Sequence, residues 1–177
     1  MKKISIIILA TLGFSMIFSA CKKYEEGPAL TFRTPKQRVV GTWSLEEARY
    51  NNIKIDFNNL QGLINSFNLG GMDMDSIPFD LSELSLKSIK LNLEKEGDGQ
   101  IKIEIAYQML QLPAYNQDIT WSFDDKKDAL IFSTENSSDN QSFKILKLTK
   151  NELWLERTDT NNGVASIVNF DLEKIKE

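Results

Sequence analysis

The chain contains no histidine, and its single cysteine is at position 21. Without histidine it cannot build a Ser-His-Asp or Cys-His catalytic site, a histidine-based zinc site, or the commonest general base near neutral pH. With one cysteine, no disulfide can form within the chain. The sequence also lacks a Gly-x-Ser-x-Gly elbow, a phosphate-binding loop and a dinucleotide fingerprint. We therefore expect a protein without catalytic activity, cofactor or metal.

Basic residues are in the minority, with 21 Lys and Arg against 25 Asp and Glu and a net charge of −4. Nucleic-acid binding calls for a basic face, so an acidic surface argues against that class of partner. It argues equally against an electrostatic attachment to anionic lipid. The length of 177 residues suits one domain after the N-terminal segment.

The first twenty residues have the form of a secretory signal. Lys2 and Lys3 precede an uncharged, mostly apolar segment, residues 4–20, which ends in the small residues Ser19 and Ala20. This pattern predicts a cleavable signal peptide over residues 1–20. An uncleaved anchor helix is one alternative, for which the apolar run is barely long enough because spanning takes about 20 residues. An ordinary cleaved signal is the other.

The segment Phe18-Ser19-Ala20-Cys21 resembles the lipobox of bacterial lipoproteins, with Phe18 where that family usually has leucine. The resemblance implies that the Cys21 thiol accepts a diacylglyceryl group and that a peptidase cuts between Ala20 and Cys21. Each buried methylene contributes about 0.8 kcal/mol, so two or three acyl chains form a durable anchor. We expect a protein of the cell envelope, attached by its acyl chains to the outer membrane, on the periplasmic face or the cell surface.

Residues 21–37 are expected to form a lipidated tether that is extended and mobile, because they are rich in charge and contain the turn pair Gly27-Pro28. The acidic pair Glu25-Glu26 resembles a weak form of the signal for export to the outer face of the outer membrane. A plain solvated linker is the simpler interpretation.

Residues 38–177 follow the pattern of short strands. Apolar and polar residues alternate most clearly over three segments: 89–93, 101–105 and 119–123. Such alternation indicates one buried and one solvated face. Gly97-Asp98-Gly99 and Asn162-Gly163 are typical of hairpin turns. The sequence predicts an all-β fold, an antiparallel up-and-down meander of about eight or nine strands closed into a barrel without exposed edges.

A helical and irregular insertion over residues 58–85 interrupts the strands. Four apolar residues take the spacing of one helix face, and they are Leu60, Leu63, Ile64 and Phe67. This insertion either forms part of a binding site or caps one end of the barrel. Three acids follow in it, Asp73, Asp75 and Asp80. Their oxygens suit Ca²⁺, but the spacing lacks the usual loop pattern, so a solvated acidic loop is favoured.

Two other groups of residues raise functional hypotheses. Glu46 and Glu47, beside Trp43, suggest the paired carboxylates of a glycosidase, although acids are common enough for such a pair to arise by chance. Apolar residues around Pro113 either line a barrel mouth or pack a strand end, and they are Tyr107, Met109, Leu110, Leu112 and Tyr115.

The motif Gly41-Thr42-Trp43 resembles the Gly-x-Trp opening of lipocalins and lipocalin-like lipoproteins, and residues 147–155 resemble their late hairpin. The resemblance spans most of residues 38–172. It implies a barrel with Trp43 packed across its closed end, and Arg157 is either the arginine that stacks on that tryptophan or a surface charge. The Thr-Asp-Tyr motif, the disulfide and the C-terminal helix of true lipocalins are absent from the sequence.

Two functions of different classes remain open. The first is a membrane-anchored, non-catalytic binding module for a small apolar molecule or a glycan. The alternative is an envelope structural or assembly protein that docks onto another protein and takes no small ligand. A hydrolase that uses carboxylates is a distant third.

Overall fold

The structure is a computed structural model of the chain that describes residues 23–28, 32–57, 84–108, 110–134, 140–161 and 164–176. The predicted signal peptide, its cleavage site at Ala20 and the predicted lipidation site at Cys21 lie outside the described residues. So do residues 58–83, which make up nearly all of the predicted insertion, including Asp73, Asp75 and Asp80.

Within these described residues, one short helix and ten strands follow in chain order: α2 (Pro35–Val39), β1 (Gly41–Tyr50), β2 (Ile53–Lys54), β3 (Leu84–Leu93), β4 (Asp98–Tyr107), β5 (Leu110–Gln111), β6 (Tyr115–Phe123), β7 (Ala129–Ser133), β8 (Gln141–Leu148), β9 (Glu152–Asn161) and β10 (Val164–Lys174). The strands form one sheet in the order β10-β9-β8-β7-β6-β4-β3-β1-β2, and every pairing is antiparallel. β5 pairs with β4 alone.

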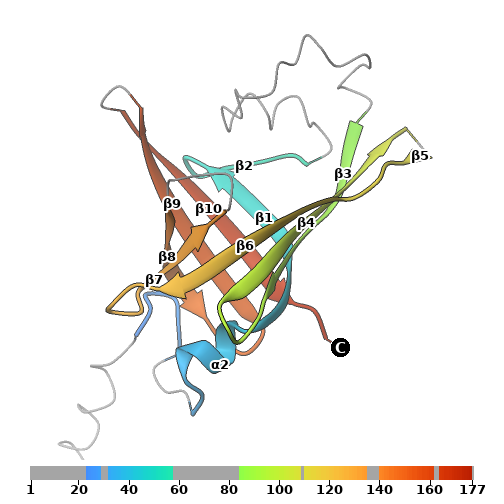
Figure 1. Cartoon of the computed structure of the whole chain (residues 1–177). Helices are drawn as coiled ribbons and strands as arrows, with labels where there is room; N and C mark the ends of the chain where they lie inside the picture. The colour runs from blue at the N-terminus through green and yellow to red at the C-terminus, as the bar shows by residue number, and fades with distance from the viewer. Residues whose placement is uncertain are drawn as a thin grey trace, which may run out of the picture.

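The sheet closes because β1 pairs on both sides, with β3 and with β10 (Figure 1). Trp43 lies opposite Leu91 of β3 and opposite Lys174 of β10. β2 and β5 are two-residue strands at the margin, so eight strands complete the ring. The predicted closed, antiparallel up-and-down barrel is confirmed.

The alternation read from the sequence corresponds to the two faces of the barrel wall. In β6, Ile119 and Trp121 are buried, whereas Thr120 and Ser122, which alternate with them, are exposed. The predicted turn between β3 and β4 is also present, with Gly97 at a φ of +102°. That φ favours glycine because a side chain is strained there.

The end of the barrel near α2 is closed by packing. Thr34 caps α2 in a reciprocal capping box with Gln37, and Pro35 takes the first turn. The helix buries Val39 against Trp43, whose indole Nε1 donates a 2.7 Å hydrogen bond to the Val39 carbonyl. Trp43 therefore lies across the closed end, as the lipocalin resemblance implies. The cation over its ring is Lys174, at 4.7 Å, and not Arg157.

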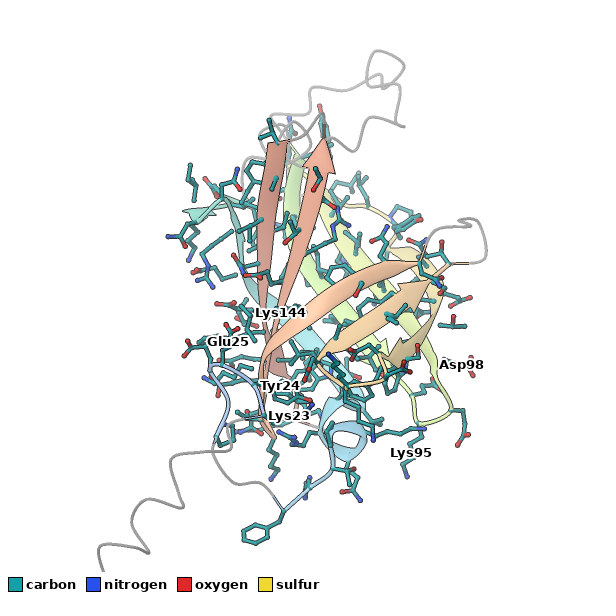
Figure 2. The ribbon with its side chains drawn as sticks, turned by 90° about the vertical axis from the view of Figure 1, so that its left-hand side faces the viewer. Lys23, Tyr24, Glu25, Lys95, Asp98 and Lys144 are labelled. Carbon is teal, nitrogen blue, oxygen red and sulfur yellow. The ribbon has the colours of Figure 1, made fainter. Side chains whose placement is uncertain are left out.

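Residues 23–28, the N-terminal strap, also pack against this end (Figure 2). Tyr24 is only 3% exposed, and its hydroxyl donates to the Lys127 carbonyl at 3.1 Å. Lys23 forms a 2.7 Å ion pair with Asp128, and the backbone N–H of Glu26 donates to the Leu146 carbonyl. The expectation of an extended, mobile tether is wrong for these residues and for α2. One aromatic side chain with a place in the core outweighs the polar composition around it.

Candidate functional site

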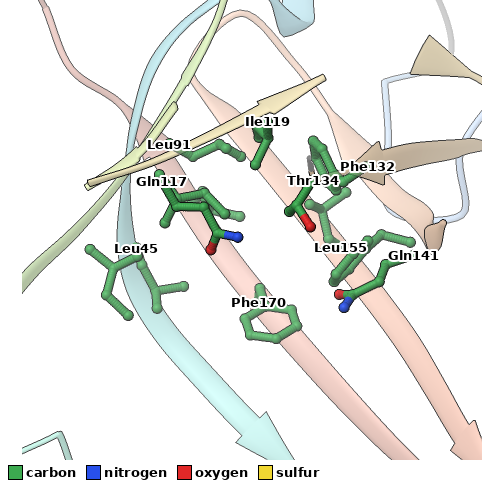
Figure 3. Close-up of a pocket in the computed structure, with 13 residues that line it drawn as sticks. Leu45, Leu91, Gln117, Ile119, Phe132, Thr134, Gln141, Leu155 and Phe170 are labelled. Atoms are coloured by element: carbon green, nitrogen blue, oxygen red, sulfur yellow. The ribbon is translucent and has the colours of Figure 1, made fainter. Parts of the chain in front are cut away.

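The closed half of the barrel is filled by large side chains, whereas the other half encloses a cavity of about 530 Å³. All eight strands of the ring contribute to its walls. The lining residues are Leu45, Ile89, Leu91, Ile101, Gln117, Ile119, Phe132, Thr134, Gln141, Phe143, Leu155, Phe170 and Leu172. Figure 3 shows them arranged around the space between the strands.

Two tryptophans, Trp43 and Trp121, belong to the same packed core as four of the lining residues, Leu91, Ile119, Leu155 and Leu172. Trp121 is held by hydrogen bonds from its indole Nε1 to the carbonyls of Glu94 and Asp98, both at 3.0 Å. Together with Trp43 it fills the closed half, where apolar side chains from several strands meet. Above them the inward positions carry only Leu, Ile and Phe or smaller polar groups, so the space between opposite walls stays open.

One wall of the cavity is a row of three phenylalanines. The rings of Phe132 and Phe143 lie 5.3 Å apart edge to face, and those of Phe143 and Phe170 lie 5.9 Å apart at a tilt. Such arrangements are favourable for aromatic pairs and hold the rings in place. The wall therefore offers a preformed apolar surface.

Three polar side chains interrupt this apolar lining, and they are Gln117 of β6, Thr134 just after β7 and Gln141 of β8. Figure 3 shows them directed into the cavity. Within the described part of the chain, the Gln117 carboxamide and the Thr134 hydroxyl have no hydrogen-bond partner, and no lining side chain is charged. The cavity thus holds a small number of unused hydrogen-bonding groups in an otherwise apolar space.

A charged pair lies beside Gln141. The guanidinium of Arg157 donates to the Gln141 Oε1 at 3.0 Å and forms an ion pair with Asp159, with an Nη2–Oδ2 distance of 2.6 Å. It also lies over the ring of Phe143, 5.8 Å from the centroid. Arg157 is therefore neither the cation on Trp43 nor a plain surface charge, because it contacts two residues of the cavity wall.

The carboxylates proposed as catalytic do not form such a site. The Glu47 carboxylate forms ion pairs with Lys54 and, at 2.7 Å, with Arg49, and both cations lower its pKa. Glu46 is exposed. Asp171, which was not one of the predicted acids, lies opposite Glu47 in the β1–β10 pairing. Burial raises the pKa of Asp171, and the Arg49 guanidinium at 2.9 Å opposes this shift. None of these acids is among the described lining residues. Across the ranges described, no group of His, Cys, Asp and Glu side chains is arranged to hold a metal ion.

The residues around Pro113 lie at strand ends and not in the cavity. Leu110 is 67% exposed and Tyr115 is 53% exposed, while Tyr107 and Leu112 are half-buried. Met109 lies outside the described residues. The other four, Tyr107, Leu110, Leu112 and Tyr115, are not among the lining residues that the structure describes.

The polar residues of the cavity were not predicted from the sequence, although two of them carry a signal there. Gln117 has the same parity as Ile119 and Trp121, and Gln141 has the same parity as Phe143 and Ile145. A polar residue on the inward parity of an otherwise alternating strand is the pattern that marks a polar group in the interior.

No protein-family model matches the sequence, and no curated protein matches it. Several solved structures are similar, among them lipocalins. The siderocalin Ex-FABP is 11% identical, with 79% of this chain and 76% of that chain covered and a TM-score of 0.42. Bovine odorant binding protein in its complex with undecanal is 12% identical, with 84% and 77% covered and a TM-score of 0.43. The bovine lipocalin allergen Bos d 2 is 9% identical, with 80% and 76% covered and a TM-score of 0.40.

With identities this low and TM-scores below 0.5, these similarities carry no argument about fold, ligand or function. The lipocalin-like architecture rests on the closed antiparallel meander itself. By fold and site the chain is a small β-barrel with an apolar internal cavity. Among the described residues, no helix has the length and apolar character needed to cross a membrane.

Proposed function

We propose that this protein is a membrane-anchored, non-catalytic barrel that binds a small apolar molecule. The observation that carries the proposal is the cavity of about 530 Å³, lined by every strand of the ring. Binding sites for small molecules are typically concave, mostly apolar and roughly 300–1,000 Å³ in volume, with a few polar groups that orient the ligand. Burying apolar ligand surface there contributes roughly 25 cal/mol per Å².

The anchor belongs to the same proposal. The lipobox resemblance supports acylation of Cys21, which stands two residues before Lys23 of the N-terminal strap. Two residues reach no more than about 7 Å. Because the strap packs on the closed end of the barrel, the acyl chains would hold that end near the bilayer. Attachment to the outer membrane of the cell envelope is proposed on the same basis.

A docking role without a small ligand remains the alternative, and one observation favours it. Four apolar side chains are exposed, and they are Ile53 of β2, Leu110 of β5, Tyr115 of β6 and Val164 of β10. β2 and β5 lie at the end of the barrel away from α2 (Figure 1). Exposed apolar residues of this size can contribute to an interaction surface. A protein partner seated there would cover the cavity mouth.

Native mass spectrometry of the processed protein, extracted from its own envelope in detergent, separates these functions. We expect an added mass that is released on denaturation and that identifies a small apolar ligand. Leu45→Trp, which fills the cavity, is expected to lose this mass, whereas the outward-facing control Ser122→Trp keeps it. A clean apo mass for all three proteins would contradict the binding function and favour the docking function.

The anchor is tested by Cys21→Ala. Because a lipoprotein peptidase acts only on the acylated cysteine, we expect an unprocessed precursor that takes up no labelled fatty acid. Immunoblotting with a palmitate label measures both. Normal cleavage and labelling of the variant would contradict the anchor.

A further inference from the structure

We propose that the cavity selects long-chain amphiphiles with an uncharged hydrogen-bonding head, such as a long-chain alcohol, over fatty acids, and that Asp159 enforces this selection by holding Arg157. The inference rests on the proposed binding function and names the ligand class of the same site.

The apolar part of the ligand follows from the walls. Ten of the thirteen lining residues are Leu, Ile or Phe, and the three rings of Phe132, Phe143 and Phe170 form one continuous wall. A glycan buried there would leave many of its hydroxyl groups without partners, which is unfavourable in an apolar space. An alkyl chain has no hydrogen-bonding groups and therefore avoids this penalty.

The head of the ligand follows from the three polar side chains. The Gln117 carboxamide both donates and accepts hydrogen bonds, and the Thr134 hydroxyl does the same. Neither has a protein partner in the described part of the chain. The Gln141 Oε1 is taken by Arg157 at 3.0 Å, which leaves the amide N–H groups of Gln141 as donors. A hydroxyl or a carbonyl satisfies this set, and no formal charge is needed.

Arg157 would be the natural partner for a carboxylate head, but it is already paired. Its Nε and Nη2 donate to the same carboxylate oxygen of Asp159 at 3.0 and 2.6 Å. The two residues are spaced i, i+2 on β9, so they point to the same face of the strand. Arg157 is also in contact with the wall, since it lies over the Phe143 ring. A carboxylate placed beside Arg157 would therefore meet the like charge of Asp159.

Removing that like charge should reverse the preference, because specificity often depends on a repulsive group as much as on an attractive one. In Asp159→Asn the guanidinium keeps its place on Gln141 but loses its ion pair. It can then donate to a ligand carboxylate in a charge-assisted hydrogen bond. Asp159 is thus proposed as a specificity-determining residue.

The experiment measures displacement of the fluorescent apolar probe N-phenyl-1-naphthylamine from the full processed protein at pH 7.5. The competitors are dodecan-1-ol and dodecanoate, each below its micellar concentration. For the wild type we expect the alcohol to compete at about tenfold lower concentration than the acid, a factor that corresponds to about 1.4 kcal/mol. In Asp159→Asn we expect dodecanoate to displace the probe at about tenfold lower concentration than in the wild type. The concentration of dodecan-1-ol needed for displacement should stay the same.

Two further variants separate this effect from a general change of charge or fold. Asp118→Asn removes an acid from the exposed face of β6 and should leave both competitors unchanged. The double variant Arg157→Gln/Asp159→Asn should lose the gain in dodecanoate binding, because the guanidinium is the group that binds the carboxylate. A third variant, Gln117→Leu, removes one of the groups proposed to bind the head of the ligand, so dodecan-1-ol should displace the probe only at higher concentration.

Equal or tighter binding of dodecanoate by the wild type would overturn the inference while leaving the binding function in place. The same holds if Asp159→Asn brings no gain for dodecanoate. If the probe does not bind to the wild type and neither competitor raises its melting temperature, the binding function itself fails, and the inference fails with it.

Discussion

Trp43 joins the sequence motif at the start of β1 to the closed end of the barrel. Its ring is fully buried, its indole N–H is bonded to Val39, and Lys174 lies over its face. Lys174 also donates to the Arg38 carbonyl at 2.8 Å, so the last strand is tied to α2 through this one side chain. A single aromatic residue thus connects α2, β1 and β10.

We therefore expect Trp43→Ala to lower the free energy of unfolding by roughly 3–5 kcal/mol, the cost of truncating a large buried side chain. Urea denaturation followed by circular dichroism measures it. Trp154→Ala is the matched control, since Trp154 is only half-buried and packs under Lys147 at 4.1 Å. A loss for Trp43→Ala no larger than that for the control would contradict the packing role.

Glu104 on β4 offers a test at the level of one charge. Its carboxylate is bound by Lys102 at 2.8 Å and by the Ser88 hydroxyl at 2.6 Å, and these contacts lower its pKa from 4.5 to about 2. A depressed pKa in the folded state stabilises the fold above the ordinary pKa, and this contribution is lost as the pH falls toward the folded value.

The expected outcome is that wild-type protein loses stability between pH 4.5 and pH 2 more steeply than Glu104→Gln. The reason is that only the wild type must take up a proton at this position on acidification. Melting temperatures across that window measure the slope. Parallel curves for the two proteins would show that Glu104 has no part in the acid response.

At the scale of elements, the N-terminal strap is the part of the fold that depends most on a few contacts. Burial raises the pKa of Tyr24 to about 12, against the opposing effect of Arg38, whose guanidinium lies 5.7 Å from the ring centroid. Arg38 itself donates to the Leu148 carbonyl. The strap, α2 and the end of β8 thus form one packed unit.

Tyr24→Ala should release the strap and destabilise the domain by about 2 kcal/mol or more, since a buried aromatic ring is removed. Tyr24→Phe, which loses only the bond to Lys127, should cost about 1 kcal/mol. Limited proteolysis of residues 23–28, together with urea denaturation, measures both effects. Glu25→Gln, which breaks only the exposed pair with Lys144, serves as the control and should change neither. Equal protease resistance of wild type and Tyr24→Ala would argue that the strap is not held by this ring.

α2 shows how a local signal can be present and yet misread. Thr34 and Gln37 have the spacing of a capping box, and Pro35 occupies the first helical position. These residues predict a helix start, but the surrounding charge and the neighbouring proline and glycine favoured a linker. What holds a five-residue helix in place is the burial of Val39, and a nonlocal contact of this kind cannot be read from the segment itself.

At the scale of the whole molecule, closure of the ring is the property that distinguishes this fold from an open sheet. β1 and β10 are paired from Trp43 opposite Lys174 to Tyr50 opposite Val168. These strands lie far apart in the sequence, and their pairing leaves the ring without a free edge there.

Hydrogen exchange tests this closure. We expect amides in the β1–β10 pairing to exchange as slowly as those in the β3–β4 hairpin, because in a closed ring either pair opens only with global unfolding. Exchange measured by mass spectrometry after peptic digestion gives the comparison. Markedly faster exchange in β10 would indicate a barrel that opens at this seam.

The sequence alone determined the strand period, the turn at Gly97 and the all-β meander, because alternation and turn chemistry are local properties of the backbone. It also excluded histidine-dependent chemistry. Only the tertiary structure decided that Gln117 and Gln141 face one cavity, that Arg157 contacts its wall, and that Tyr24 belongs to the core. These contacts depend on the register between strands and on how far the closed end is filled, and both are set by interactions between residues distant in the chain.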